Sequence, residues 1–301
     1  MNELKNPKLA VPIVLLAGIF WSFGPYVVRN IDQAHTVPWQ YLFARGLVIF
    51  LLLNFYLYLE EGYSFYKNYI KIGISGIIGG TGLACAMITF IWSITNTTAA
   101  ITLLCLAAMP FITALLGFLF LKEKISINVW VSILVATLGI IIMAFGNHEK
   151  NTLIGFVLGI VSAIGFSVFS VSLRWRKETP KFTTVALAGL ICFLVSSIVI
   201  INKDLSFFST SKNEALFAVH GTIVCLGMIL YAIASKNIPA AELTLLSLTE
   251  VIGGIFWVWI PWLGINEVPG TNTIIGGFLI FLALIYYSLI IKSNRRFIAL
   301  N

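Results

Sequence analysis

Long apolar runs, separated by short polar or charged segments, fill almost the whole chain. Each run approaches the roughly 20 residues that a helix needs to cross the hydrocarbon core of a bilayer. The pattern predicts an all-α polytopic membrane protein with ten transmembrane helices, at about 9–29, 38–59, 70–92, 97–121, 127–146, 152–173, 182–202, 214–235, 239–263 and 271–291. Pro38, Pro180 and Pro239 stand at or just before three of these helix starts, where a missing N–H costs nothing.

The composition excludes the other broad classes of protein. The 301 residues are 59% hydrophobic and only 10% charged, whereas soluble domains have about 25% charged residues. Disorder requires the opposite composition, and too few polar residues remain to cover a soluble surface. The four cysteines lie within apolar runs and form no CxxC pair or Cys/His cluster, so we expect neither a disulfide framework nor a metal site, and no cofactor.

The basic residues predict how the helices are oriented. If the N-terminus is cytoplasmic, 14 of the 19 Lys and Arg residues fall on the cytoplasmic side and one, Arg45, lies within a span. The outer segments hold 4, which are Arg29, Lys150, Lys203 and Lys212. The positive-inside rule therefore places both termini in the cytoplasm. The membrane we expect is a bacterial inner (plasma) membrane. Orientation explains the net charge of +7, so no nucleic-acid partner is expected.

The two halves of the chain repeat each other. Gly18 and Gly24 correspond to Gly159 and Gly165, an offset of about 141 residues. The segment TLLCL at 102–106 matches TLLSL at 244–248 at an offset one larger, so the register of helix 9 against helix 4 stays open by one residue. Because each predicted half has five helices, the second (152–291) must run through the membrane inverted relative to the first (9–146). Chance similarity between apolar helices is the alternative.

These motifs resemble the drug/metabolite transporter superfamily, specifically its EamA-type ten-helix permeases. The stretches that carry the likeness are GIFWSFGPYVVR in helix 1, FARGL with Arg45 in helix 2, AAITLLCLAAMPFITALLGFLFLKEKIS in helix 4, and IPAAELTLLSLTEVIGGIFWVWIPWLGINEVPG in helix 9, with Glu250 at the characteristic glutamate. Val251 stands where the family has a proline, although Pro110 occupies the matching place in helix 4. The stretch from that position to the closing glutamate is also longer in the second half, 251 to 267 against 110 to 123. The resemblance implies secondary transport by alternating access, most often export of amino acids or other small metabolites.

Ionisable residues within the predicted spans are the first functional candidates, because a charge inside a membrane costs at least about 2.5 kcal/mol. Glu250 fits a ligand for a cationic or zwitterionic substrate, or a proton carrier, since removal from water favours a protonated carboxyl group. The alternative is a hydrogen-bonded carboxyl that pins helix 9. Arg45 and Glu242 are candidates for gating or proton coupling. The alternative for Arg45 is a structural clamp, and the alternative for Glu242 is simple contact with water or Lys236. His220 is either a substrate ligand or a satisfied hydrogen-bonding group.

Aromatic residues complete the candidate binding site. Trp21 lies between two glycines in helix 1, so it is either the wall of a cavity or bulk that faces lipid. Tyr26 and Tyr231 offer hydroxyl groups, and Trp92 lies deep within its span. We expect a central cavity lined by helices 1, 3, 4, 6, 8 and 9.

The sequence thus predicts a secondary active transporter of a small polar or zwitterionic metabolite, such as an amino acid or amine, with proton coupling as an option. A non-transporting membrane scaffold or receptor is the alternative. An enzyme is disfavoured, because the chain has no HExxH or GxSxG motif. The expected partners are a small-molecule substrate and membrane lipids, and the expected assembly is a monomer or homodimer.

Overall fold

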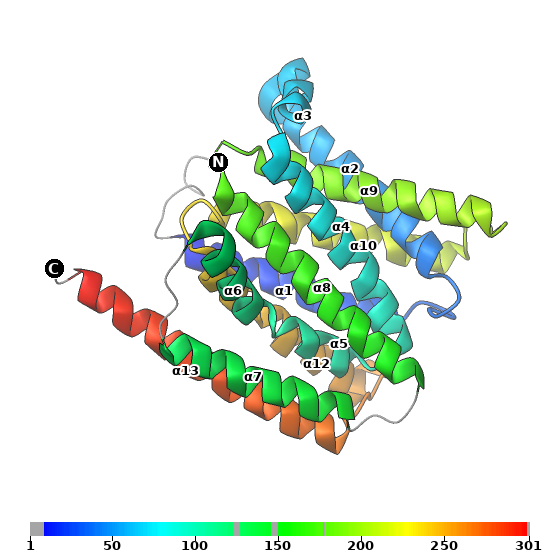
Figure 1. The fold of residues 1–301 in the computed structure, drawn as a ribbon. Helices are drawn as coiled ribbons and strands as arrows, with labels where there is room; N and C mark the ends of the chain where they lie inside the picture. Colours follow the sequence, from blue (N-terminus) through cyan, green and yellow to red (C-terminus); the bar gives the residue numbers. More distant parts are fainter. Residues whose placement is uncertain (1–8, 123–126, 146–149, 177, 300–301) are drawn as a thin grey trace.

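The computed structural model describes residues 9–122, 127–145, 150–176 and 178–299, and within these ranges every regular element is a helix (Figure 1). The α-helices are α1 (Ala10–Arg29), α2 (Pro38–Glu61), α3 (Lys67–Ile70), α4 (Gly73–Asn96), α5 (Ala99–Leu106), α6 (Met109–Leu121), α7 (Ile127–Phe145), α8 (Lys150–Trp175), α9 (Lys181–Asn202), α10 (Ser211–Ala234), α11 (Ala240–Leu246), α12 (Thr249–Trp259) and α13 (Thr271–Ala299). Two short 3₁₀ helices are η3 (Gly62–Tyr66) and η4 (Pro261–Leu263).

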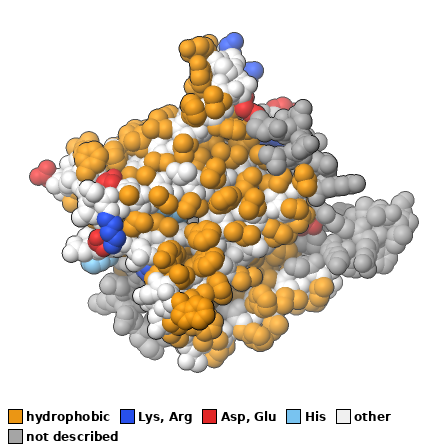
Figure 2. All heavy atoms as spheres, turned by 180° about the vertical axis from the view of Figure 1, so that it is seen from behind, with side chains coloured by type: hydrophobic (Ala, Val, Ile, Leu, Met, Phe, Trp, Pro, Cys, Tyr) orange, Lys and Arg blue, Asp and Glu red, His pale blue; other side chains and the backbone are white. Residues whose placement is uncertain are grey.

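The helices are long and apolar enough to cross a membrane. Among the described residues, 8 segments of at least 18 residues meet that condition, and two shorter apolar stretches lie at Trp130–Ile142 and Thr271–Tyr287. Hydrophobic side chains cover most of the face seen in Figure 2, with charged side chains near its margins. Soluble proteins rarely expose so much continuous apolar surface. The chain is therefore an all-α polytopic membrane protein, as the sequence predicts.

Two of the predicted spans are broken helices, which corrects the expectation of one continuous helix in each. The span predicted at 97–121 is interrupted at Ala107 and Ala108, where it divides into α5 and α6. Pro110, in the first turn of α6, lacks an N–H, and its ring would clash with the carbonyl of Leu106 in a continuous helix. Non-helical backbone at membrane depth is tolerated where protein buries it.

The second break has a different local cause. The span predicted at 239–263 divides into α11 and α12 at Ser247 and Leu248, with no proline at this point. The N–H of Leu248 bonds to the carbonyl of Leu245 (3.2 Å), and the N–H of Glu250 bonds to that of Ser247 (2.9 Å). These contacts span three residues rather than four, so the backbone tightens into a 3₁₀-type turn at the break. The helix then ends at Trp259, before Pro261, rather than at residue 263.

The connection between the third and fourth spans also differs from expectation. Residues 93–96, predicted as the connection, form the last turn of α4, and only Thr97 and Thr98 separate α4 from α5. Thr98 caps α5, because its side chain accepts a hydrogen bond from the N–H of Ile101 at 3.2 Å. Such caps satisfy backbone donors that have no partner within the helix.

Close helix packing depends on glycine at two crossings. A Cβ atom added at Gly82 of α4 would lie 2.9 Å from the carbonyl oxygen of Gly165 in α8. A Cβ atom added at Gly46 of α2 would lie 2.8 Å from the carbonyl oxygen of Gly189 in α9. The backbones of these helices therefore touch without intervening side chains, as is common between membrane helices. In Figure 1, α4 and α8 lie side by side, whereas α7 and α13 run together along one edge of the bundle.

Candidate functional site

A small cavity lies inside the bundle. Its volume is about 50 Å³, which has room for only a few water molecules. Its walls come from α1, α2, α4, α5, α6, α8, α10 and α12, and its lining residues are Trp21, Arg45, Leu83, Ala86, Met87, Phe90, Leu106, Met109, Ser162, Phe166, His220, Val224, Met228 and Glu250. All six predicted lining helices contribute to it, and so does the second predicted span, through Arg45.

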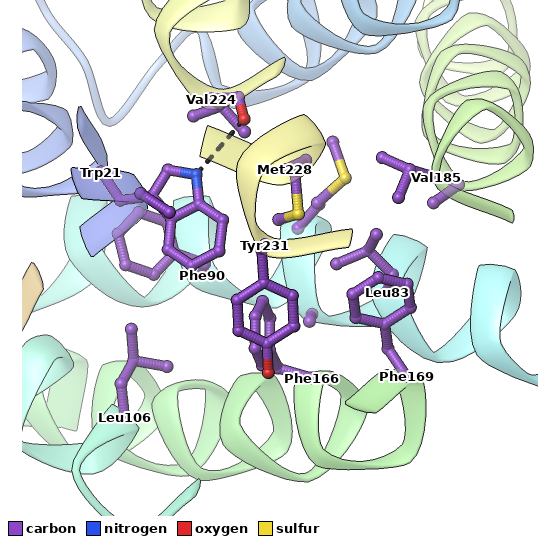
Figure 3. Packing of buried hydrophobic residues seen from close by; sticks show 14 of the residues in the cluster. Trp21, Leu83, Phe90, Leu106, Phe166, Phe169, Val185, Val224, Met228 and Tyr231 are labelled. Carbon is purple, nitrogen blue, oxygen red and sulfur yellow. Dashed lines mark hydrogen bonds between the residues drawn. The ribbon is translucent and has the colours of Figure 1, made fainter. Parts of the chain in front are cut away.

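Trp21 forms an aromatic wall of this cavity. Its side chain is 4% exposed, so it does not face lipid. The indole N–H donates a 3.2 Å hydrogen bond to the carbonyl of Val224 on α10, drawn as a dashed line in Figure 3. The Trp21 ring meets Phe166 edge-on, with centroids 5.7 Å apart, and lies 5.5 Å from the ring of Tyr231. These contacts hold the indole in one orientation against α8 and α10.

Arg45 and Glu250 bring opposite charges to the same cavity. Arg45, on α2, is 4% exposed, and Glu250 lies in the first turn of α12, directly after the helix break. The two side chains are close enough for their charges to interact. Nevertheless, the buried Nε and Nη1 atoms of Arg45 have no hydrogen-bond partner among the described residues. Because buried polar groups nearly always have a partner, these donors are available to a molecule that enters the cavity.

His220 lies on the α10 side of the cavity and is 2% exposed. Its Nδ1 atom is hydrogen-bonded to the hydroxyl of Tyr41 on α2, and the Tyr41 ring stacks on Phe217, with centroids 4.9 Å apart. The opposite edge of the imidazole faces Gly24 of α1, where an added Cβ would lie 2.7 Å from Nε2. Tyr41 therefore fixes the orientation of the histidine from one side, and the absence of a side chain at Gly24 leaves room for it on the other.

Four predicted site residues do not line this cavity. Tyr231 is fully buried behind Trp21, and its hydroxyl is 2.7 Å from Ser170 Oγ. Tyr26 is half-buried on α1, and Trp92 packs against Trp39 with ring centroids 5.3 Å apart. Glu242 lines a separate apolar groove of about 870 Å³ between α1, α11, α12 and α13. The structure thus brings together Trp21, Arg45, His220 and Glu250, but not these four.

An ion pair ties several segments together at the end of the bundle where α1 ends. Arg29 Nε lies 2.7 Å from Glu267 Oε2, and the other guanidinium nitrogens donate to the carbonyls of Ile94 (2.7 Å) and Thr97 (2.8 Å). Glu267 also accepts a hydrogen bond from the N–H of Ala99 at the start of α5. We call these contacts the Arg29–Glu267 latch. It joins α1, the α4–α5 connection and the segment before α13.

Sequence reasoning did not select Arg29, Tyr41 or Glu267 as site residues. Arg29 is counted there only as an outer-loop charge, although an arginine at a helix end beside a short polar connection has several carbonyls within reach. Tyr41 has no distinguishing signal in the sequence, because its importance comes from a contact with a residue 179 positions away. Among the described residues, no group of three His, Cys, Asp or Glu side chains is arranged to hold a metal ion.

Comparison with known proteins identifies relatives of the chain. Residues 8–145 match the EamA-like transporter family. The pseudopaline exporter CntI of Pseudomonas aeruginosa is 24% identical over 285 residues, which cover 93% of this chain and 96% of the relative. An uncharacterized transporter of Helicobacter pylori is 24% identical over 256 residues, covering 82% of this chain and 84% of that protein.

A solved crystal structure of a protein shares the fold. It is 17% identical, with a TM-score of 0.69, and the match covers 95% of this chain and 98% of that one. The family match and the relatives confirm the resemblance to EamA-type permeases and support a transporter rather than an enzyme. The first half of the chain thus matches the EamA-like transporter family, and nearly the whole chain is similar to transporters, as a multi-pass membrane protein.

Proposed function

We propose that the chain carries a small zwitterionic metabolite, such as an amino acid, across the bacterial inner membrane by alternating access. The observation that carries this proposal is the pair of unpartnered Arg45 nitrogens on the wall of a cavity that also contains Glu250. A guanidinium group with free donors suits a carboxylate. A glutamate suits an ammonium group. One molecule that bears both groups matches both charges and leaves neither unpaired.

The cavity is too small to hold such a molecule as it stands. Sites for small molecules usually measure about 300–1,000 Å³, against about 50 Å³ here. The structure therefore fits a closed state, which must widen for the substrate to enter. Met87 and Met228 lie on the wall, and methionine side chains adapt easily to a new shape. The aromatic residues Trp21 and Phe166 then provide apolar contact for the body of the substrate.

Binding is tested with three matched ligands: an amino acid, the amine that lacks its carboxylate, and the N-acetyl derivative that lacks its ammonium group. We expect only the amino acid to raise the melting temperature of the purified protein. Arg45→Gln should remove the preference for the amino acid over the amine that lacks the carboxylate. Glu250→Gln should remove the preference for the amino acid over the N-acetyl compound that lacks the ammonium group. If both variants fold and keep the wild-type preferences, the proposed binding mode is wrong.

Transport and its coupling are tested in proteoliposomes. We propose that Glu250 carries a proton as well as binding the substrate, because it is the only acidic residue on the described cavity wall. Counterflow of an amino acid identified by the melting assay should depend on pH in the wild type and not in Glu250→Gln. Glu242→Gln is the matched control, because that carboxyl lies in a different groove. A folded Glu250→Gln protein that transports at the wild-type rate from pH 5 to 8 would refute the coupling.

We also propose that the two halves are inverted repeats. Helix packing supports this, because contacts that the repeat would make equivalent are found in both halves. The α4–α8 contact corresponds to α10–α1, the α4–α9 contact to α10–α2, and the α6–α8 contact to α12–α1. Export is the proposed direction, since a relative is named as an exporter. For the proposed cytoplasmic termini, a membrane-impermeant amine reagent should modify the exposed Lys203 only from outside the cell.

A further inference from the structure

A second pocket lies at one end of the bundle, and its lining residues are all different from those of the central cavity. Its volume is about 590 Å³, and it is bounded by the end of α8, the start of α9 and the connection between α10 and α11. Its lining includes three basic residues, Arg174, Lys181 and Lys236, and no acidic residue among those described. We call it the basic pocket.

Lys181 is held in place within the basic pocket. It is the first residue of α9 and is half-buried. Its Nζ donates a 2.8 Å hydrogen bond to Ser235 Oγ, and that hydroxyl is itself anchored on the carbonyl of Ala232 at 2.8 Å. Ser235 is only 4% exposed, so it offers the ammonium group a fixed partner on the pocket wall. An ammonium group has three donors, and the bond to Ser235 uses one of them.

Two further basic residues among those described lie near Lys181. Arg174 and Lys236 both act electrostatically on its ammonium group. Like charges gathered at the edge of a membrane repel one another unless an anion lies between them. The N-terminus of α9 adds partial positive charge at the same place, because no side chain caps it. The amide of Asn237 on the pocket wall offers a further donor.

We propose that the basic pocket binds a phosphate group. A phosphate carries more charge than a chloride ion and has several separate acceptor oxygens, so it can take hydrogen bonds from Lys181, Lys236 and Asn237 at different oxygens. Its position at the helix ends lies at the depth of lipid headgroups, and basic pockets between helices at that depth bind anionic lipids. The phosphate therefore comes either from an anionic phospholipid or from a phosphorylated solute. This site is independent of the proposed substrate cavity.

The experiment compares two phosphate sources by the melting temperature of the full-length protein. One arm uses nanodiscs of phosphatidylcholine alone or with one-fifth phosphatidylglycerol, and the other adds inorganic phosphate to the phosphatidylcholine nanodiscs, with chloride at equal ionic strength as the reference. We expect stabilisation in at least one arm, and the double variant Lys181→Met/Lys236→Gln should lose more than half of it. Lys212→Gln is the control, because it removes an exposed basic residue that lies outside the pocket.

The outcomes distinguish a lipid from a soluble phosphate source, and they also show whether the basic pocket binds phosphate at all. Stabilisation by phosphatidylglycerol alone indicates a lipid headgroup, whereas saturable stabilisation by phosphate indicates a soluble ligand. An equal response in the wild type and the double variant, or an equal effect of chloride and phosphate with no effect of phosphatidylglycerol, overturns the proposal. If the double variant does not fold, the exposed Lys236→Gln variant is compared with the wild type in the same two arms. A response equal to that of the wild type in both arms overturns the proposal too. Transport by the central cavity does not enter these readouts.

Discussion

We expect the Arg29–Glu267 latch to hold one end of the bundle closed, so weakening it should open that end. Glu267→Gln removes the carboxylate that binds Arg29 Nε and the N–H of Ala99. A hydrogen bond to a charged group contributes about 1.5–3 kcal/mol. The two side chains are 21% and 16% exposed, so solvent screening favours the lower half of that range. We take about 2 kcal/mol, which corresponds to roughly a 30-fold shift in the balance between closed and open states at this end.

The assay measures how fast a cysteine on the cavity wall reacts with a membrane-impermeant thiosulfonate reagent. Ser162→Cys, in a background whose four native cysteines are replaced by alanine, places the thiol in the cavity. We expect Glu267→Gln to raise the reaction rate from the latched end by roughly 30-fold, because reactivity follows the population of the open state.

The control for this experiment is an ion pair at the same end of the bundle. Lys212 Nζ lies 2.6 Å from Asp32 Oδ1, but the two side chains are 57% and 53% exposed. Exposed pairs of this kind contribute little, so Asp32→Asn should leave the rate within about twofold of the parent. If Glu267→Gln also stays within twofold, the latch does not hold this end closed and the reasoning fails.

Three further changes test packing and local structure, each by the melting temperature of the purified protein. Gly165→Ala should destabilise it by about 1–3 kcal/mol, because the added Cβ would meet the backbone of α4. Gly270→Ala is the control and should be neutral, because its Cβ would meet only the Thr273 hydroxyl at 4.0 Å. Tyr41→Phe should destabilise it by about 1–3 kcal/mol, because it leaves buried His220 without its partner, and an unchanged melting temperature would contradict that role. Thr98→Ala should cost about 1 kcal/mol through the lost cap of α5, and a neutral result would show that water replaces the cap.

Periodicity and charge in the sequence predict the helical architecture well, because the membrane constrains each segment strongly. A run of apolar residues of the right length has almost no stable alternative to a helix in a bilayer. The helix breaks are harder to predict. Pro110 marks the first, but no proline marks the second, where 3₁₀-type bonds surround Ser247 and Thr249 contacts the carbonyl of Leu15 on α1. Propensity carries no information on such tertiary contacts.

The candidate site could be predicted only in part, and the division has a physical basis. Arg45, His220 and Glu250 are recognisable because an ionisable residue in an apolar run is costly and rarely accidental. Tyr231 and Trp92 show the limit: aromatic residues are common in this chain, and which of them reaches a cavity depends on how the helices rotate. The partner of His220 could not be found, because Tyr41 is distant in sequence and lies among many similar residues.

The contact between Gly82 and Gly165 has a mechanical consequence. Both glycines lie near the middle of their helices, Gly73–Asn96 and Lys150–Trp175, where bare backbone meets bare backbone. Such a contact can serve as a fulcrum, because no side chain stands between the two backbones at this point. With a lever arm of about 15 Å, set by ten residues of 1.5 Å rise, a tilt of about 10° moves each end by about 3 Å in opposite directions. Opening one side of the membrane would then narrow the other in the same movement.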